Sequence, residues 1–420
     1  MQAYLTTTAL AVLMLLGLPA QAQTDDALPG ASVESLLSLV KSQNPELASM
    51  RFEAQAARER VEPAGALMDP KLRLEWMDIT KGSSQSPTLL PSEVGSTKYT
   101  LMQDLPWFGK RDLKKNIAQQ DAQAVEGKVL STWAELAAKV KVAHAQRYYL
   151  HHTQQLTQEL LALTNRLAAV AQVRYAGGLA MQQDAIRAQV EQTAMQTELV
   201  ALASEARQAD ARLNALLARP ANAPLAEALS LRPMPVSLEP EAVMARVRQS
   251  NPQLLSEQAR IQSAELSREL TRKNRYPDFT LAITPTQMQS RISEWGVMLE
   301  LNIPLQQGTR RAQEREAQAM LDAAQKRREA VSNQLWSDVS ENLSGLDAAQ
   351  RTEQLAKSSL LPQAELTFQS ALASYENGKL DFATLLEAQR QVRQAKQSQL
   401  KAQLDAQMRL AEIEKLWGEE

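Results

Sequence analysis

The sequence predicts a mainly α-helical fold with a small β part, in which one long-helix assembly occurs twice. Three observations predict it: an internal repeat, a composition typical of helices, and a change of hydrophobic period within each copy. The repeat is about 200 residues long, far longer than a solenoid unit. It pairs Val40–Leu47 with Val247–Leu254 at an offset of 207 (247 − 40), and Tyr175–Gly178 with Tyr375–Gly378 at an offset of 200 (375 − 175).

The composition is that of long helices packed through small side chains. Hydrophobic residues make up 44% of the 420 residues, but aromatic residues make up only 4%. The formal net charge is −2 and no basic stripe stands out, so we expect no nucleic-acid partner. Cysteine is absent, so we expect no disulfides and no lipid anchor on an N-terminal Cys.

Residues 1–22 are predicted to be a secretory signal peptide. Ala9–Leu18 is an apolar run of suitable length, and Ala20-Gln21-Ala22 fits the small-residue cleavage pattern. The alternative is a short buried helix. Beyond this segment no apolar stretch approaches the roughly 18 residues of a membrane-spanning helix. That does not exclude membrane strands, whose alternating pattern is much weaker.

Each copy reads as helix, strand, turn, strand, long helix, turn, helix. We expect the first repeat at residues 23–218, a Pro- and Ala-rich linker at 219–240, and the second repeat at 241–420. Asn44-Pro45 and Asn251-Pro252 are predicted helix starts. Asn can cap the free amides there, and Pro at the first helical position needs no N–H. These two helices are expected to end near residues 66 and 274.

The hydrophobic period then changes from 3.6 to 2, which predicts β-hairpins at residues 70–106 and 277–304. Leu72, Leu74 and Trp76 alternate with charged residues in the first hairpin, and alternation resumes from Trp295 in the second. Each strand therefore has one apolar face. Loops are expected at residues 81–96 and 285–293.

Two long helical hairpins follow, at residues 109–217 and 308–418. Leu156, Leu160, Leu163 and Leu167 step by 4, 3 and 4, which is the spacing of a coiled-coil seam. Gly177-Gly178 and Asn377-Gly378 are the predicted turns, because Gly and Asn tolerate positive φ. Pro362 is expected to break the second long helix.

Four strands cannot close a membrane barrel alone, because the smallest such barrels have about eight. An open sheet would expose unpaired edge amides to lipid. We therefore expect an internally duplicated long-helix α-barrel with four strands per chain, closing as a 12-stranded transmembrane β-barrel in a trimer. Trp76, Tyr99, Trp107 and Trp295 near strand ends favour this interpretation, since Trp and Tyr mark membrane interfaces. The alternative is a soluble coiled-coil protein capped by a small sheet.

With these features the chain resembles the TolC-like outer-membrane factors, the exit ducts of tripartite efflux pumps and type I secretion systems. The duplication, the paired Asn-Pro starts, the two hairpins and the Tyr-x-x-Gly turns carry the resemblance. QDLPWFGKR at Gln103–Arg111 is similar to the motif of the heavy-metal (Czc/Cus-like) branch. The resemblance implies a homotrimer in the outer-membrane lipid of a Gram-negative bacterium, with its helices in the periplasm. It also implies a periplasmic adaptor (membrane fusion) protein and an inner-membrane transporter of RND type as partners.

The resemblance further implies a periplasmic gate just after the turns. The candidate constriction residues are Tyr175, Asp184, Tyr375, Thr384 and Glu387, and the candidate adaptor-docking tips are Gly177, Gly178, Asn377 and Gly378. Leu380 stands where the best-known member has a gating Arg, so that salt bridge is not carried over. Three copies of Glu387 would concentrate cations, as carboxylate rings do in cation-selective pores. The alternative is that Glu387 lies on a solvated helix face.

We expect no catalytic, cofactor or metal site. The only histidines are His144, His151 and His152, and the adjacent pair makes a poor chelate. No Gly-rich phosphate loop or Ser/His/Asp arrangement is present. The sequence thus predicts the outer-membrane channel of a tripartite efflux system, which gives cargo, expected to be metal cations, passive exit. The alternatives are a duct for drugs or for type I protein secretion and, from another class, a soluble periplasmic scaffold or adaptor.

Overall fold

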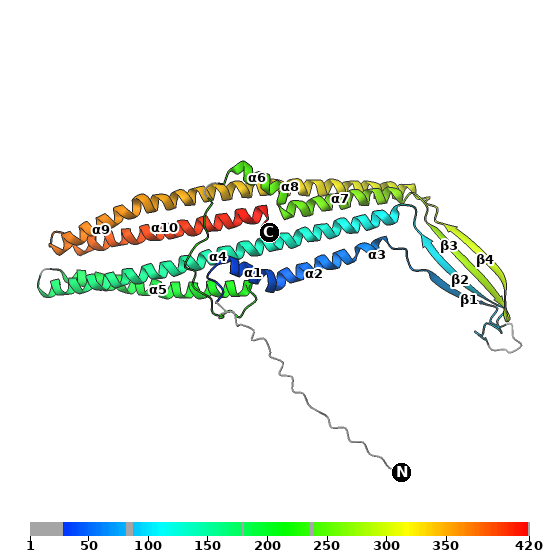
Figure 1. The fold of residues 1–420 in the computed structure, drawn as a ribbon, viewed down its shortest axis with the longest axis horizontal. Helices are drawn as coiled ribbons and strands as arrows, with labels where there is room; N and C mark the ends of the chain where they lie inside the picture. The colour runs from blue at the N-terminus through cyan, green and yellow to red at the C-terminus, as the bar shows by residue number, and fades with distance from the viewer. Residues whose placement is uncertain (1–27, 81–86, 179, 236–237, 419–420) are drawn as a thin grey trace, which may run out of the picture.

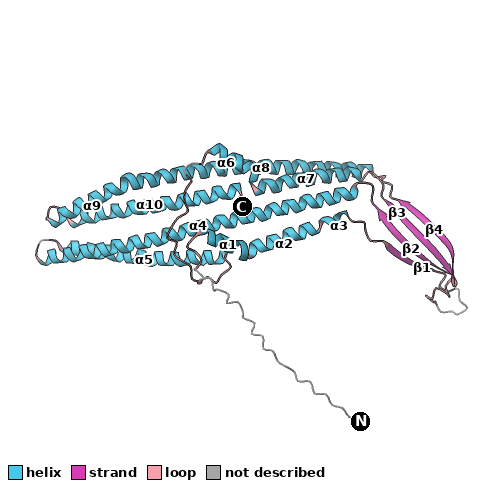
Figure 2. Ribbon diagram, viewed as in Figure 1, coloured by secondary structure: helices cyan, strands magenta, loops and turns pink. Residues whose placement is uncertain are grey.

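The computed structural model describes residues 28–80, 87–178, 180–235 and 238–418, so the predicted signal peptide lies outside the described residues. These residues form an elongated body with two helical hairpins at one end and a four-stranded sheet at the other (Figure 1, Figure 2). Within these ranges no helix combines the length and the hydropathy that a membrane span requires.

The helices repeat in the same order in both halves of the chain. The first half contains α1 (Val33–Gln43), α2 (Pro45–Glu59), α3 (Val61–Gly65), α4 (Lys110–Ala176) and α5 (Gln182–Leu216). The second half contains α6 (Pro240–Ser250), α7 (Pro252–Lys273), α8 (Gln307–Leu355), α9 (Leu361–Glu376) and α10 (Phe382–Trp417). Helices α1 and α6 were not expected from the sequence, although each is amphipathic and ends directly before an Asn-Pro pair.

The two Asn-Pro pairs begin α2 and α7, as predicted. Asn44 Oδ1 accepts from the Leu47 amide at 3.1 Å, and Asn251 Oδ1 accepts from the Leu254 amide at 2.9 Å. Each Asn also donates from Nδ2 to a carbonyl at the end of a returning helix, of α5 in one repeat and of α10 in the other. One side chain per repeat therefore satisfies backbone groups at two helix ends.

The sheet joins the two repeats through its central strands. Its order is β1 (Lys71–Met77), β2 (Ser96–Leu105), β3 (Phe279–Met288) and β4 (Arg291–Leu301), with every pair antiparallel. The expected loop at residues 285–293 is wrong, because β3 continues through Pro285 to Met288 and the turn is short. A register irregularity at Thr286/Gln287 next to Pro285 explains how a strand without one N–H persists there.

The sheet has one apolar and one polar face. Leu72, Leu101, Ile283 and Val297 lie in one row across all four strands, and all four are exposed. The other face of the sheet carries charged and hydroxyl side chains, such as Arg73, Lys98 and Thr280, and there Lys71 Nζ pairs with Asp104 at 2.7 Å. An exposed apolar surface of this extent needs a nonaqueous environment or a partner.

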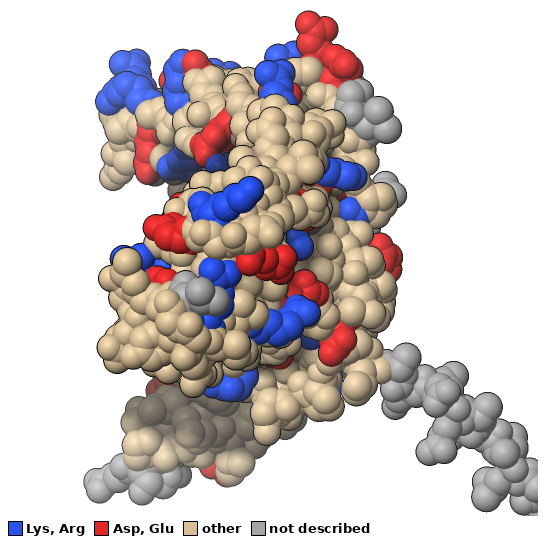
Figure 3. Space-filling model, turned by 90° about the vertical axis from the view of Figure 1, so that its left-hand side faces the viewer, with Lys and Arg blue, Asp and Glu red and all other residues tan. Residues whose placement is uncertain are grey.

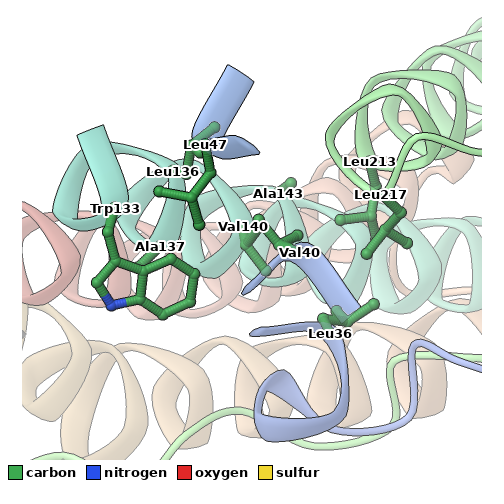
Figure 4. Close-up of a cluster of buried hydrophobic side chains, with 10 residues drawn as sticks. All are labelled: Leu36, Val40, Leu47, Trp133, Leu136, Ala137, Val140, Ala143, Leu213 and Leu217. Atoms are coloured by element: carbon green, nitrogen blue, oxygen red, sulfur yellow. The ribbon is translucent and has the colours of Figure 1, made fainter. Parts of the chain in front are cut away.

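Helix α4 is the central element of the helical part. It packs against α2 and α7 in the half near the sheet, and against α5 and α10 in the half near the hairpin tips (Figure 1). The α1 side chains Leu36 and Val40 meet Trp133, Leu136 and Val140 of α4 in a core at the middle of the molecule (Figure 4). Helix α6 covers an equivalent core over α8 and α10.

The second long helix is not broken at Pro362, contrary to the expectation. Instead α8 continues into α9 through one π-helical turn, η1 (Ala356–Leu360), in which the Leu361 amide donates to the Ala356 carbonyl. All flanking residues keep right-handed helical dihedrals. The wider turn rearranges the carbonyls that a proline ring would otherwise meet in a regular helix.

Candidate gate at the helical tips

The two hairpin turns have the same backbone geometry. Gly178 and Gly378 both have φ of +72°, the left-handed conformation that glycine adopts without strain. Gly177 and Asn377 keep negative φ, so one residue of each predicted turn, the glycine in second place, has the left-handed conformation. The side chain of Asn377 instead donates to the Ala373 carbonyl at 2.8 Å and closes the end of α9.

Side chains from both repeats form one core behind these turns. Leu167 and Ala171 of α4, Ala188 of α5, and Tyr375 and Phe382 of the second hairpin are buried together. Tyr375 and Phe382 have ring centroids 5.4 Å apart. The two tips are thus held together inside one chain by apolar packing, and movement of one hairpin away from the other would expose this core.

Tyr375 is the most buried of the predicted gate residues, with 2% of its surface exposed. Its hydroxyl has no hydrogen-bond partner among the described residues. Burial raises the pKa of Tyr375; the nearby Arg174 opposes this rise and Asp184 adds to it. The neutral phenol is therefore the stable form, and Asp184 is close enough to act on it electrostatically.

Tyr175, the repeat mate of Tyr375, has a different environment. Its ring is 44% exposed and does not enter the tip core. The same sequence motif therefore gives two different environments: Tyr375 is buried in the tip core, whereas Tyr175 is exposed. The tip core contains one of these two candidates and not the other.

Arg174 is a functional candidate that the sequence analysis missed. Its Nη1 donates to the Tyr375 carbonyl at 2.7 Å and to the Glu376 carbonyl at 3.1 Å. Its guanidinium also lies 4.9 Å from the Tyr375 ring centroid. A cation at these carbonyls is favoured by the dipole of α9. One signal was available: Leu380 leaves the second hairpin without its expected Arg, and Arg174 precedes the tyrosine of the first.

Asp381 is an acidic residue of the second hairpin that the sequence analysis did not single out, three residues before Thr384. Its carboxylate accepts from the Thr384 amide at 3.0 Å and caps the first turn of α10. Hydrogen bonds from the Thr384 side chain and backbone lower the pKa of Asp381. Thr384 thus supports a helix cap. Asp184 lies in the first turn of α5, where an acidic residue is favourable for the helix dipole.

Glu387 lies on an exposed stripe of α10, and its side chain is 60% exposed. It shares this stripe with Thr384, Gln391, Gln394 and Lys401. Arg390 lies 3.8 Å away and also pairs with Glu191 of α5 at 2.7 Å. The charge of Glu387 is therefore partly balanced within its own chain.

The end view of the tips shows basic and acidic side chains interspersed rather than one large patch of a single sign (Figure 3). In the part of the chain that the structure describes, no three His, Cys, Asp or Glu side chains gather so as to hold a metal ion. His151 and His152 contact each other edge to face on α4.

Comparison with known proteins identifies the family. The pattern of the outer membrane efflux protein family matches residues 36–219 and 243–419, which is most of the chain. The chain is 23% identical over 372 residues to the cobalt-zinc-cadmium resistance protein CzcC of Cupriavidus metallidurans, covering 87% of this chain and 84% of that protein.

Solved channel structures share the fold. CusC superposes with a TM-score of 0.80 at 16% identity, covering 94% of this chain and 93% of that one. VceC of Vibrio cholerae has a TM-score of 0.78 at 17% identity, with coverage of 92% and 96%. The predicted fold class, a long-helix barrel continuous with a β-barrel closed by three chains, is thereby confirmed. The chain therefore belongs to the outer membrane efflux protein family and is the outer-membrane channel of an efflux system, in which trimeric members work with an adaptor and an inner-membrane pump.

Proposed function

We propose that this channel gives divalent metal cations a passive route from an RND-type pump to the exterior. The choice of metal cations as cargo rests on the similarity to the cobalt-zinc-cadmium resistance protein along 372 residues, 87% of this chain. The channel uses no cofactor and makes or breaks no covalent bond. The apolar face of the sheet lies in outer-membrane lipid, and the helices extend into the periplasm.

The gate belongs to the tip core. Tyr375 and Arg174 hold the second hairpin to the first. We assign the carboxylates of Asp184 and Glu387 to the lining of the passage. Thr384 positions the Asp381 carboxylate through the α10 cap. Tyr175 is exposed, and we assign it to the adaptor contact together with the turns.

The turn residues Gly177, Gly178, Asn377 and Gly378 form the surface that the adaptor contacts. At Gly178 an added Cβ would meet nothing within 4 Å, whereas at Gly378 it would lie 3.2 Å from Arg174 Nη2. The first turn therefore has more room for a partner than the second.

Growth of a deletion strain in cobalt, zinc or cadmium salts tests the cargo. Loss of tolerance to these cations, restored by the intact gene, supports metal export. Sensitivity to organic drugs alone, or loss of one secreted polypeptide, would instead support the alternative cargo classes. A matched strain that carries Arg351→Gln, which alters an ion pair within α8, controls for expression.

Bilayer recordings test the gate independently of the cargo. Glu387→Gln removes a carboxylate from the exposed stripe of α10, so we expect lower cation selectivity and weaker block by divalent ions. Unchanged selectivity would place Glu387 on an ordinary solvated face. Glu365→Gln on exposed α9 surface provides a neutralisation of equal size outside the proposed gate.

A further inference from the structure

Helix α5 carries four acidic residues at strict seven-residue spacing: Asp184, Glu191, Glu198 and Glu205. In a coiled coil this spacing places side chains on one face, with a rise of about 10.5 Å between neighbours. The two middle residues face α10, which belongs to the other repeat. Glu191 Oε2 lies 2.7 Å from Arg390, and Glu198 lies 3.4 Å from Arg393.

These four side chains, Glu191, Glu198, Arg390 and Arg393, form what we call the α5–α10 cluster. Arg393 also approaches Glu191 at 3.9 Å, so it contacts both glutamates. The Glu191 side chain is only 7% exposed, unlike the members of most surface ion pairs. A buried carboxylate that loses its cationic partners is strongly destabilised, so this contact resists separation of α5 from α10.

The cluster connects helices that otherwise have little direct contact. Both α5 and α10 pack against α4, which lies between them. A buried hydrogen bond from Gln389 Nε2 to Thr164 Oγ1, at 2.8 Å, joins α10 to α4 at the same level. The two arginines thus join α10 directly to α5, and any movement that separates the first hairpin from the second must lengthen these ion pairs.

We propose that the α5–α10 cluster is a second restraint, distinct from the tip contacts, that limits how far the two hairpins separate when the gate opens. This proposal depends on the proposed function of the tips as a gate. Glu191 lies nine residues beyond the start of α5 at Gln182, about 13 Å along the helix axis. Arg174 acts at the turns, whereas the cluster acts further along the hairpins and determines how much of their length comes apart.

Thiol labelling of the full-length trimer tests this proposal without requiring channel activity. The chain has no cysteine, so a single introduced thiol is the only one present. Ala188→Cys places it in the buried tip core, one turn of α5 before Glu191, and Ala209→Cys places it at a buried site nearer the middle of the molecule. The rate of reaction with a maleimide then reports local opening at each position.

We expect the double variant Arg390→Gln/Arg393→Gln to raise the labelling rate of Ala188→Cys by about tenfold or more, as loss of charge-assisted bonds to a buried carboxylate predicts. The rate for Ala209→Cys is expected to stay unchanged. Arg390→Lys/Arg393→Lys keeps both positive charges beside Glu191 and Glu198, so it should leave the rate for Ala188→Cys close to that of the parent. Arg351→Gln, which alters only an exposed pair within α8, should have no effect.

Two results would overturn the proposal. One is an unchanged labelling rate for Ala188→Cys in the double variant. The other is an equal acceleration at Ala209→Cys, which would mean general loosening of the hairpin. Bilayer recordings separate this outcome from failure of the proposed gate: a conducting parent whose conductance is the same in Arg174→Gln would refute the gate, whatever the labelling shows.

Discussion

Asn44 and Asn251 show how single residues hold this molecule together. Each begins a helix, and each donates to the end of another helix that lies far away in sequence. Both are buried, so a missing hydrogen bond there would not be replaced by water. Because the same two contacts occur in both repeats, they belong to the duplicated assembly itself.

Substitution at Asn44 separates its two contacts. Asn44→Asp keeps an acceptor for the Leu47 amide but replaces the donor with a charged oxygen near the Leu216 carbonyl. We expect Asn44→Asp to cost more stability than Asn44→Ser, which keeps the cap, and a typical cap is worth about 1 kcal/mol. Thermal unfolding of the two variants measures the difference. Ser42→Ala on the exposed face of α1 is the control, and equal losses from Asp and Ser would contradict the role of the Leu216 contact.

Arg174 is a second single residue that joins the two hairpins. Arg174→Gln removes the charge that lies over the Tyr375 ring and at the end of α9, while leaving a side chain able to donate one hydrogen bond. We expect a larger mean conductance in bilayers, with roughly a tenfold shift toward the open state for the loss of charge-assisted bonds. Arg166→Gln, an exposed position two to three turns earlier on α4, should behave like the parent. A conductance equal to the parent's would remove Arg174 from the gate.

At the scale of elements, the π-helical turn reflects one extra residue in a seven-residue pattern. Buried positions continue from Ala349 of α8 to Ala356 of η1 at a spacing of seven, but the next buried position, Ala364 of α9, follows after eight. An α-helix would rotate the later residues away from α10, and the wider turn corrects this rotation. We therefore attribute the π-helical turn to the extra residue in the spacing of buried positions. Pro362 is tolerated because the wider turn moves the carbonyls that its ring would otherwise contact.

Three variants distinguish these causes. Pro362→Ala should leave the π turn and the melting temperature almost unchanged, because the extra residue remains. Deletion of exposed Ser359 should shorten the pattern to seven but place Pro362 within a regular helix, at a cost of about 3 kcal/mol. The deletion combined with Pro362→Ala should recover most of this loss in thermal unfolding. If the deletion alone leaves the melting temperature unchanged, Pro362 does not require the π-helical turn.

The same elements show what the sequence could predict. The Asn-Pro helix starts and the alternating strands depend on local chemistry, so they were visible without tertiary information. The partners of Arg174 could not be predicted, because they are carbonyls of another helix and no side-chain pattern marks a carbonyl. Pro285 was misleading for a related reason: proline usually ends a strand, but an irregular register accommodates it here. Helices α1 and α6 were missed although Leu36 and Val40 have helical spacing.

At the scale of the whole molecule, α4 extends from the sheet to the tips and carries a buried polar group near the middle. His144 is buried on α4, and its Nε2 has no hydrogen-bond partner among the described residues. Burial lowers the pKa of His144, and the positive charge of Arg147 lowers it further. The folded protein therefore keeps this imidazole neutral under conditions in which the unfolded chain binds a proton.

This difference predicts a loss of stability at acid pH. The pKa of His144 is lowered in the folded state from its ordinary value of 6.5. Above pH 6.5 the imidazole is neutral in both states and the folded protein keeps its full stability. As the pH falls below this value the unfolded chain binds a proton that the folded protein does not, so the free energy of unfolding decreases. One proton corresponds to about 1.4 kcal/mol per pH unit. Melting temperatures measured from pH 7 to pH 5 should fall less steeply in His144→Gln than in His152→Gln. Equal slopes would contradict the prediction.

The order of the strands has a consequence for biogenesis. β2 pairs with β3, and partners such as Thr97 and Gln287 are separated by 190 residues (287 − 97). Contacts this distant in sequence form slowly, because the chain between them must first be brought to order. The sheet cannot be completed until the second repeat has been synthesised and exported. A chain truncated before β3 would leave a lone hairpin, which is at best marginally stable, so premature insertion of half a molecule into the membrane is disfavoured by the topology itself.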